Sequence, residues 1–259
     1  MKKNRNSEPS STEARKRFGP VVPVPLIIEN ITRLTGGVEL QEEEMIRLSP
    51  IPIPPEPAAQ ADIFFRTVYP GCAQINVVTD HRKTERDGEI ICSPRGPGVT
   101  RTAAQWAEHC KTQGVPSGDA GAWFRPNAVS GPGSGFAGTV TDEDIASLGY
   151  LLVESDIVTM PQQLSVLARL ELPIVSIVTS GGSSAHALVN IRATNPDDYD
   201  AAAYSLFGCL RVFGIDTVNS NPSRLSRLPG AVRKIGGTGD GRQRLLYLNP
   251  NASNETIIR

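Results

Sequence analysis

Residues 149–248 alternate between strand-like and helix-like patterns in the order β-α-β-β-α-β, and this order constrains the fold most strongly. In the split βαβ arrangement that follows, strands 1 and 3 lie side by side at the centre of an antiparallel sheet. The predicted strands and helices are, in chain order, residues 150–154, 161–170, 174–178, 186–191, 197–213 and the runs within 225–232 and 245–248.

The first half of the chain predicts a separate α/β lobe. Prolines between 50 and 57 predict an extended connector, and the glycines of 131–138 mark a flexible join. We therefore expect an α/β (α+β) fold with a disordered basic tail at 1–20, an N-terminal α/β lobe at 21–138 and a C-terminal split βαβ lobe at 139–259. Within the N-terminal lobe, helices are predicted at 21–34, 39–48, 58–69 and 102–112, and strands at 73–79, 89–92 and 123–124.

Composition excludes several classes of protein. No apolar run approaches the length of a membrane span and the first 17 residues lack an apolar centre, so we expect a cytoplasmic protein with no membrane partner. Four scattered cysteines indicate neither a disulfide framework nor a zinc site. A net charge of −1 does not by itself indicate a nucleic-acid binder, although basic residues gather in 1–17 and again in 224–244.

Two acids, Glu154 and Asp156, close the first predicted strand of the C-terminal lobe. Alternation along a strand turns both carboxylates to one face and leaves Ser155 on the other. Such acids repel each other unless a cation lies between them, and oxygen ligands suit Mg²⁺ or Mn²⁺. An isolated pair of acids at a strand end is more often solvated surface, so this interpretation depends on the residues that follow.

A glycine turn and two donors precede the third predicted strand. Gly181 and Gly182 offer backbone N–H groups, and Ser184 and His186 alternate onto one face directly after them. Together these groups predict a site for the phosphates of a triphosphate. Taken alone, a histidine beside an apolar run is more often a packed structural residue.

Asp216 follows the second predicted helix and is a third candidate acid. The ordinary interpretation is a loop acid or an N-cap. If strand 4 begins here, Asp216 approaches the strand 1 pair and completes a cage of three carboxylates. Such a cage holds two metal ions about 3.5 to 4 Å apart.

The order of these motifs resembles that of the archaeo-eukaryotic primase superfamily, and the chain looks like the prim-pol branch carried by phages, plasmids and mobile elements. The likeness covers the C-terminal lobe, and the N-terminal lobe only loosely through 123–127. It rests on the runs 151–156, 180–186 and 224–230 together with Asp216.

The resemblance implies a primase-polymerase fold whose C-terminal lobe is RRM-like and catalytic. In related sequences a lysine commonly occupies the place of Ser183, so one charged contact to nucleotide or template is missing here. The catalytic residues implied are Glu154, Asp156, Asp216 and His186, of which the three acids bind the metal; the nucleotide-binding residues are Gly181, Gly182, Ser184, His186 and Arg227; and the template-binding residues are Arg224, Arg233 and Lys234.

The function that the resemblance implies is that of a DNA primase or primase-polymerase, a nucleotidyltransferase that uses Mg²⁺ or Mn²⁺. Its partners are a single-stranded DNA template and NTP or dNTP. No Walker A sequence for a helicase is present, so we expect the chain to work with a separate replicative helicase or to be truncated before one.

Other functions remain open at this point. Nucleotide cyclases and palm-type polymerases also use paired strand acids with two metals. An inactive primase-like module that only binds single-stranded nucleic acid is a further alternative, although the third strand offers no aromatic residue for base stacking. A rolling-circle nuclease is disfavoured because Ala187 and Leu188 follow His186 where such enzymes place a second histidine.

Overall fold

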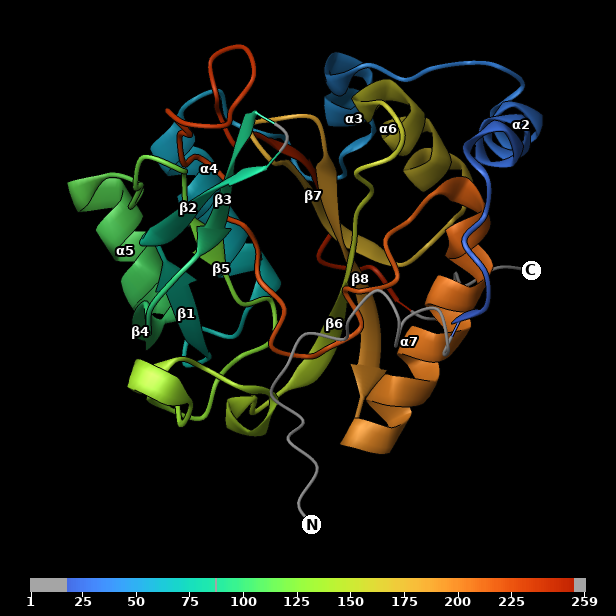
Figure 1. Ribbon diagram of the computed structural model, residues 1–259. Helices are drawn as coiled ribbons and strands as arrows, with labels where there is room; N and C mark the ends of the chain where they lie inside the picture. Colours follow the sequence, from blue (N-terminus) through green and yellow to red (C-terminus); the bar gives the residue numbers. More distant parts are fainter. Residues whose placement is uncertain (1–17, 87, 254–259) are drawn as a thin grey trace.

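The computed structural model describes residues 18–86 and 88–253 (Figure 1). Of the predicted basic tail, residues 1–17 lie outside this range. Phe18 belongs to the folded body, because it is buried and its ring lies 5.7 Å from that of Tyr204 and 6.3 Å from that of Phe207. The predicted disorder therefore does not extend to Phe18.

A four-stranded antiparallel sheet organises the first part of the molecule. Its strand order is β4 (Val99–Thr102), β1 (Gln74–Val78), β5 (Trp123–Phe124) and β9 (Ser226–Arg227). Helices α4 (Pro57–Val68) and α5 (Ala103–Gln113) pack on one face of this sheet (Figure 1). Their aromatic residues Phe64, Phe65 and Trp106 pack with Ile75 and Phe124, and burial of this apolar surface stabilises the layer.

A second four-stranded antiparallel sheet lies beside the first. Its order is β10 (Leu245–Leu248), β7 (Ile174–Thr179), β8 (Ala185–Ala193) and β6 (Leu148–Val153). Alternation along β6 and β8 sends Leu152 and Leu188 into the core shared with α4 and α5, and Leu151 and Ala187 into a core on the other face. The helices that cover that other face are α3 (Glu42–Leu48), α6 (Met160–Arg169) and α7 (Pro196–Leu210), with α2 (Val24–Thr35) packed outside α6.

The mixed helix and antiparallel-sheet class is as predicted, but the strand order is not that of a split βαβ unit. Strands 1 and 3, now β6 and β8, are neighbours as expected. However, β6 is an edge strand, and β10 pairs with β7 instead of β6. The reason is visible at the free edge of β6, where the side chain of Asn127 bonds both the N–H (2.9 Å) and the carbonyl (3.0 Å) of Tyr150. These side-chain bonds satisfy backbone groups that a further strand would pair if β6 were a central strand.

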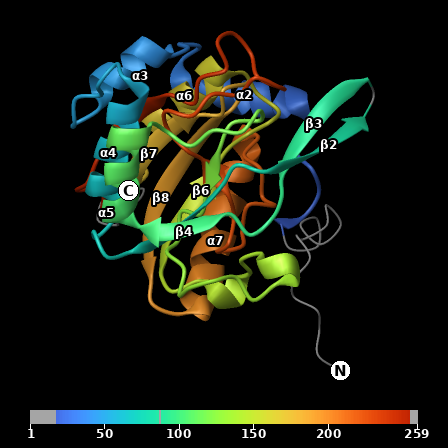
Figure 2. The ribbon, with the colours of Figure 1, turned by 90° about the vertical axis from the view of Figure 1, so that its left-hand side faces the viewer.

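The chain crosses between the two sheets after α7. Strand β9, which lies within the predicted C-terminal lobe, pairs with β5 of the first sheet, and β10 then returns to the second sheet. A separate two-stranded hairpin, β2 (His81–Arg86) and β3 (Glu89–Pro94), projects from the body (Figure 2). None of the helices in the described residues has the length and apolarity to cross a bilayer.

Candidate active site

Glu154 and His186 meet where β6 ends and β8 begins. The last pair of the β6–β8 ladder joins Val153 and Ala187, which places the next residue of each strand alongside the other. The Nε2 atom of His186 lies 2.8 Å from a carboxylate oxygen of Glu154, and both side chains are largely buried. Ser155 points to the opposite face, where its hydroxyl donates to the carbonyl of Gly214 (2.6 Å). The predicted alternation at this strand end is therefore correct.

Both oxygens of Glu154 have donors. His186 contacts one of them, and the side-chain amide of Asn219 donates to the other (2.9 Å). Burial alone would raise the pKa of Glu154, but His186, Arg224 and the Asn219 hydrogen bond outweigh it and lower the pKa well below the usual range. Glu154 is therefore a buried carboxylate that stays ionised.

Asp216 lies beside the end of β6, as predicted. Its N–H donates to the carbonyl of Glu154 (2.9 Å), and its carboxylate accepts from the N–H of Val218 (3.0 Å). The pKa of Asp156 is raised by partial burial and then by the charge of Glu154. The pKa of Asp216 is raised by burial and by the charges of Glu154 and Asp156, although the Val218 hydrogen bond opposes this. The three acids therefore lie within electrostatic range of one another.

The predicted cage of three metal-binding carboxylates is not preformed. Among the residues that the structure describes, no group of three or more His, Cys, Asp or Glu side chains is arranged to hold a metal ion. The physical reason is that His186 and Asn219 already occupy Glu154. Asp156 and Asp216 remain. Burial is the first cause of their raised pKa values and the charge of Glu154 adds to it, and a bound cation would oppose both effects. This donor set fits Mg²⁺ or Mn²⁺, which proteins often bind through one or two carboxylates plus substrate phosphates.

The hydrogen bonding inside the glycine turn differs from the prediction. The hydroxyl of Ser180 accepts hydrogen bonds from the N–H groups of Gly182 and Ser184, each at 3.2 Å, so these two donors are already engaged. Gly181 has a φ of +69°, and a methyl group there would lie 2.5 Å from the carbonyl oxygen of Gly241. Only glycine fits this position, because the loop at 233–241 packs directly on the turn.

Arg233, which we predicted to bind template, lies on this glycine turn. Its guanidinium donates to the carbonyl of Ser180 (3.2 Å) and would lie 2.9 Å from a methyl group at Gly182. Its Nε atom is buried and has no hydrogen-bond partner among the described residues. Burial lowers the pKa of Arg233. The structure therefore groups Arg233 with the predicted phosphate-binding residues.

Arg227 is a buried cation within electrostatic range of Glu154 and Asp156. It is 7% exposed, donates to the carbonyl of Ala120 (2.9 Å) and lies 4.3 Å from the centre of the Trp123 ring. Burial and then the charge of Arg233 lower its pKa to about 9, while Glu154 and Asp156 act in the opposite direction. Within residues 18–86 and 88–253, neither Arg227 nor Arg233 forms an ion pair with a carboxylate.

The other two predicted template residues lie in different surroundings. Arg224 is half-buried, and its charge lowers the pKa of Glu154, Asp156 and Asp216, so it lies within electrostatic range of the acids. Lys234 is on the surface, 3.9 Å from Asp119. Neither position tests a contact with template.

Sequence reasoning missed several residues that build this site. Asn219 carries no motif, and only the structure places it against Glu154. Ser226 lies 3.4 Å from the second ring nitrogen of His186, so the imidazole is held from both sides. Trp123 was predicted only as part of a strand at 123–124 and of the loose likeness at 123–127, but its pairing with Arg227 across β5 and β9 brings the first sheet to the site.

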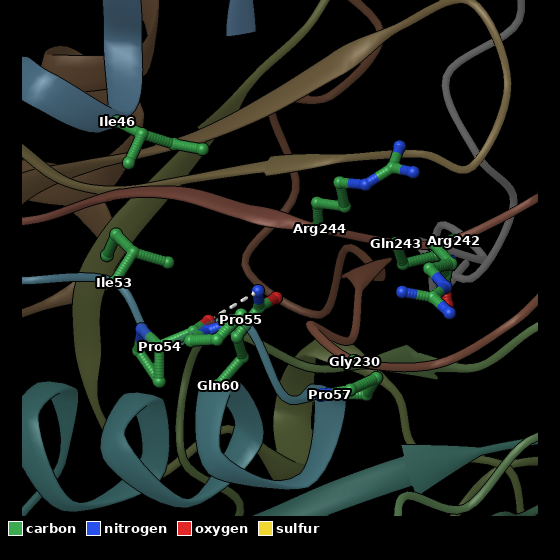
Figure 3. A pocket seen from close by; sticks show the side chains of 10 residues that line it. All are labelled: Ile46, Ile53, Pro54, Pro55, Pro57, Gln60, Gly230, Arg242, Gln243 and Arg244. Atoms are coloured by element: carbon green, nitrogen blue, oxygen red, sulfur yellow. Dashed lines mark hydrogen bonds between the residues drawn. The ribbon is translucent and has the colours of Figure 1, made fainter. Parts of the chain in front are cut away.

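A pocket of about 300 Å³ lies elsewhere, between α3, the proline-rich connector and α4 (Figure 3). The connector contributes Ile53, Pro54 and Pro55, and Arg242 and Arg244 approach from the opposite side. None of the predicted catalytic residues lines this pocket. The acids and guanidiniums described above therefore form a separate site.

Comparison with known proteins gives limited information. No protein-family model matches the chain, and no curated protein matches it. Among solved structures, the chain is similar to the AEP domain of the primase-polymerase (PrimPol) of cyanophage S-2L, with a TM-score of 0.44 and 16% sequence identity. The alignment covers 75% of this chain and 93% of that one. At this level of similarity, function has to be inferred from the site itself.

Proposed function

We propose that the chain is a metal-dependent nucleotidyltransferase of the primase or primase-polymerase kind, which synthesises primers on single-stranded DNA during replication of a mobile element. The main supporting observation is the charge arrangement around Arg227. This buried guanidinium and that of Arg233 have no carboxylate partner among the described residues, and Arg227 lies within electrostatic range of Glu154 and Asp156.

One buried and one half-buried guanidinium beside a cluster of acids suit a substrate that carries both kinds of charge. Burying an unpaired guanidinium is costly unless an anion compensates it, and guanidinium groups bind phosphate oxygens in a bidentate manner. On the other side of the site, a divalent cation relieves the repulsion between the carboxylates. A nucleotide triphosphate with its metal satisfies both requirements, so this is the substrate class that we infer.

The reaction is attack by a 3′-hydroxyl on the α-phosphate of the bound nucleotide, with pyrophosphate as the leaving group. Mg²⁺ or Mn²⁺ held by Asp156 and Asp216 would supply charge neutralisation on the phosphates. Arg227 and Arg233 bind and orient the phosphate chain, and Ser184 offers a hydroxyl that makes no hydrogen bond to the described residues. Glu154 fixes His186 in place so that the imidazole faces the same site.

The order of the sequence motifs supports the same assignment. Glu-x-Asp, Ser-x-His and Asp216 are distant in the chain, yet Asp216 bonds the backbone of Glu154 and His186 bonds its side chain. A helix-terminating loop acid or a packed histidine has no reason to converge on one carboxylate in this way.

Primer synthesis on defined templates tests the proposal. The protein is incubated with single-stranded DNA, Mg²⁺ or Mn²⁺ and either NTPs or dNTPs, and products are resolved by length. We expect template-dependent products, and we expect Asp156→Asn to reduce their formation by about 100-fold or more, as when other transition-state electrostatic contributions are removed. Asp62→Asn, which changes an acid on α4, is the matched control. Full activity in the Asp156 variant contradicts the proposal.

The choice of Asp156 for this test follows from the structure. Removing Glu154 leaves His186 and Asn219 without their shared partner, so a Glu154→Ala variant also perturbs the fold. Asp156 is more exposed than Glu154, and replacing it removes a charge that Glu154 repels. A cyclic monophosphate product from the same incubation identifies a cyclase, and DNA binding without any synthesis identifies an inactive binding module.

A further inference from the structure

The β2–β3 hairpin is a surface feature that the proposed chemistry does not use. Its two strands pair from His81 opposite Pro94 to Arg86 opposite Glu89 and form a sheet of their own. Figure 2 shows the hairpin extending away from the body, to the right in that view. A two-stranded hairpin in water is only marginally stable by itself, so an extended one is expected to gain order from a partner.

One face of this hairpin looks onto the candidate active site. The thiol of Cys92 lies within electrostatic range of both Arg227 and Arg233. Independently, a methyl group at Gly236 would lie 3.6 Å from the carbonyl oxygen of Ile90, so the hairpin contacts the loop at 233–241 that covers the glycine turn. Lys83 is the residue directly opposite Cys92 and shares its face.

Two exposed cations lie on β2 toward the root of the hairpin. Arg82 and Lys83 are exposed, and within the described residues neither forms an ion pair. Lys83 shares the face of Cys92, which lies within electrostatic range of Arg227 and Arg233, whereas Arg82 is the adjacent residue and lies on the other face. The root of the hairpin therefore carries one accessible cation on the face toward the site and a second on the opposite face.

The predicted template contacts do not supply accessible cations outside the nucleotide site. Arg233 is engaged at the glycine turn, Arg224 is half-buried within electrostatic range of the acids, and Lys234 is partnered by Asp119. A template strand that is read at the site has to extend beyond the nucleotide pocket, and its phosphates need cations that are accessible there.

We propose that the root of the β2–β3 hairpin binds the phosphates of the single-stranded DNA template through Arg82 and Lys83 and guides the strand toward the site. This inference rests on the proposed function, because it takes the template as the partner of that site. The inference is tested by measuring how tightly the protein binds single-stranded DNA, and this measurement does not require primer synthesis.

The test is fluorescence anisotropy of a labelled single-stranded oligonucleotide with the full chain in the absence of nucleotide. In the double variant Arg82→Ser, Lys83→Ser we expect affinity to fall about 10-fold or more at low salt. The slope of log affinity against log salt concentration should decrease by about 1.4, since each phosphate contact to a single strand contributes about 0.7. Affinity for a fluorescent nucleotide with Mn²⁺ should stay within about twofold of the wild type, because neither side chain belongs to the nucleotide site.

The matched control is Arg47→Ser, Lys111→Ser, which removes the same two charges from exposed positions on α3 and α5. Equal weakening in the control overturns the proposal, as does a wild-type protein that binds no single-stranded DNA or a hairpin variant that binds it normally. Strand binding that depends on Arg82 and Lys83 supports the hairpin contact even if the protein synthesises no primer, and in that case only the proposed function fails.

Discussion

The Nε2 atom of His186 lies 2.8 Å from a carboxylate oxygen of Glu154, and the two side chains are 7% and 13% exposed. The acid at the end of β6 is therefore paired before any substrate arrives. This pairing gives Glu154 a structural role as well as a place in the candidate site, and it has measurable consequences for stability.

The variant His186→Ala should lower the free energy of unfolding by about 3 kcal/mol at pH 7, because it leaves a buried carboxylate without its partner. In the wild type the pKa of Glu154 is lowered, so its contribution is present above the unfolded-state pKa and is lost only as the pH falls through the folded-state value. In the variant, fewer groups oppose the effect of burial, so the pKa of Glu154 rises. The difference in free energy of unfolding between the wild type and the variant should therefore narrow as the pH falls from about 7 toward 5.

Urea unfolding at several pH values measures this gap. The double variant Glu154→Gln, His186→Ala serves as the control, since it has no carboxylate to protonate. A gap that stays constant with pH in the single variant contradicts the pairing.

Metal binding should weaken on acidification at a higher pH than for ordinary aspartates. Asp156 and Asp216 have raised pKa values through burial and through the charge of Glu154, so protons compete for them earlier as the pH falls. Calorimetric titration of Mn²⁺ in the presence of nucleotide checks this. Glu154→Gln should move the loss of binding to lower pH, and an unchanged or opposite shift counts against the electrostatic coupling.

Arg227→Lys should raise the KM for nucleotide by about 10-fold with a smaller change in kcat. Lysine keeps the charge but loses the planar contact with Trp123 and the bidentate grip on phosphate. Steady-state kinetics with varied nucleotide measure the effect. Arg66→Lys on α4 is the matched control, and an equal change there shows that the contact is not specific.

Gly181→Ala should destabilise the protein by about 2 kcal/mol or more. The residue has a φ of +69°, and its new methyl group would meet the backbone of Gly241 at 2.5 Å. Gly208→Ala is the contrasting control, because it lies in α7 with no atom within 4 Å of the added methyl group. That variant should gain about 0.5 to 1 kcal/mol, and thermal unfolding compares the two.

Local patterns predicted the parts of the site that depend on one strand at a time. Period-two alternation alone placed Glu154 on one face and Ser155 on the other. Strand β2 was missed because its sequence, His-Arg-Lys-Thr-Glu-Arg, is polar throughout and shows no alternation. The Asp-Gly pair at 87–88 in the sequence was the available signal for this hairpin.

The parts that were wrong depend on competition between distant segments. The edge of β6 is occupied by Asn127, a residue in the other half of the chain, and no periodicity predicts such a side-chain bond. The template contact of Arg233 stays a prediction, but the sequence did not show that Arg233 lies on the glycine turn, because that position results from the path of the loop at 233–241. Burial and partners of single polar residues are set by tertiary packing.

The exchange of β9 and β10 between the two sheets bears on how the molecule can be divided. A fragment that stops at the glycine-rich join would lack the strand that completes the layer containing Trp123, and a fragment that starts there would carry that strand without its neighbour β5. We therefore expect that neither half folds by itself, and that heating or denaturant melts the protein in one cooperative transition. Cutting the chain at the join should yield two insoluble pieces instead of two working modules.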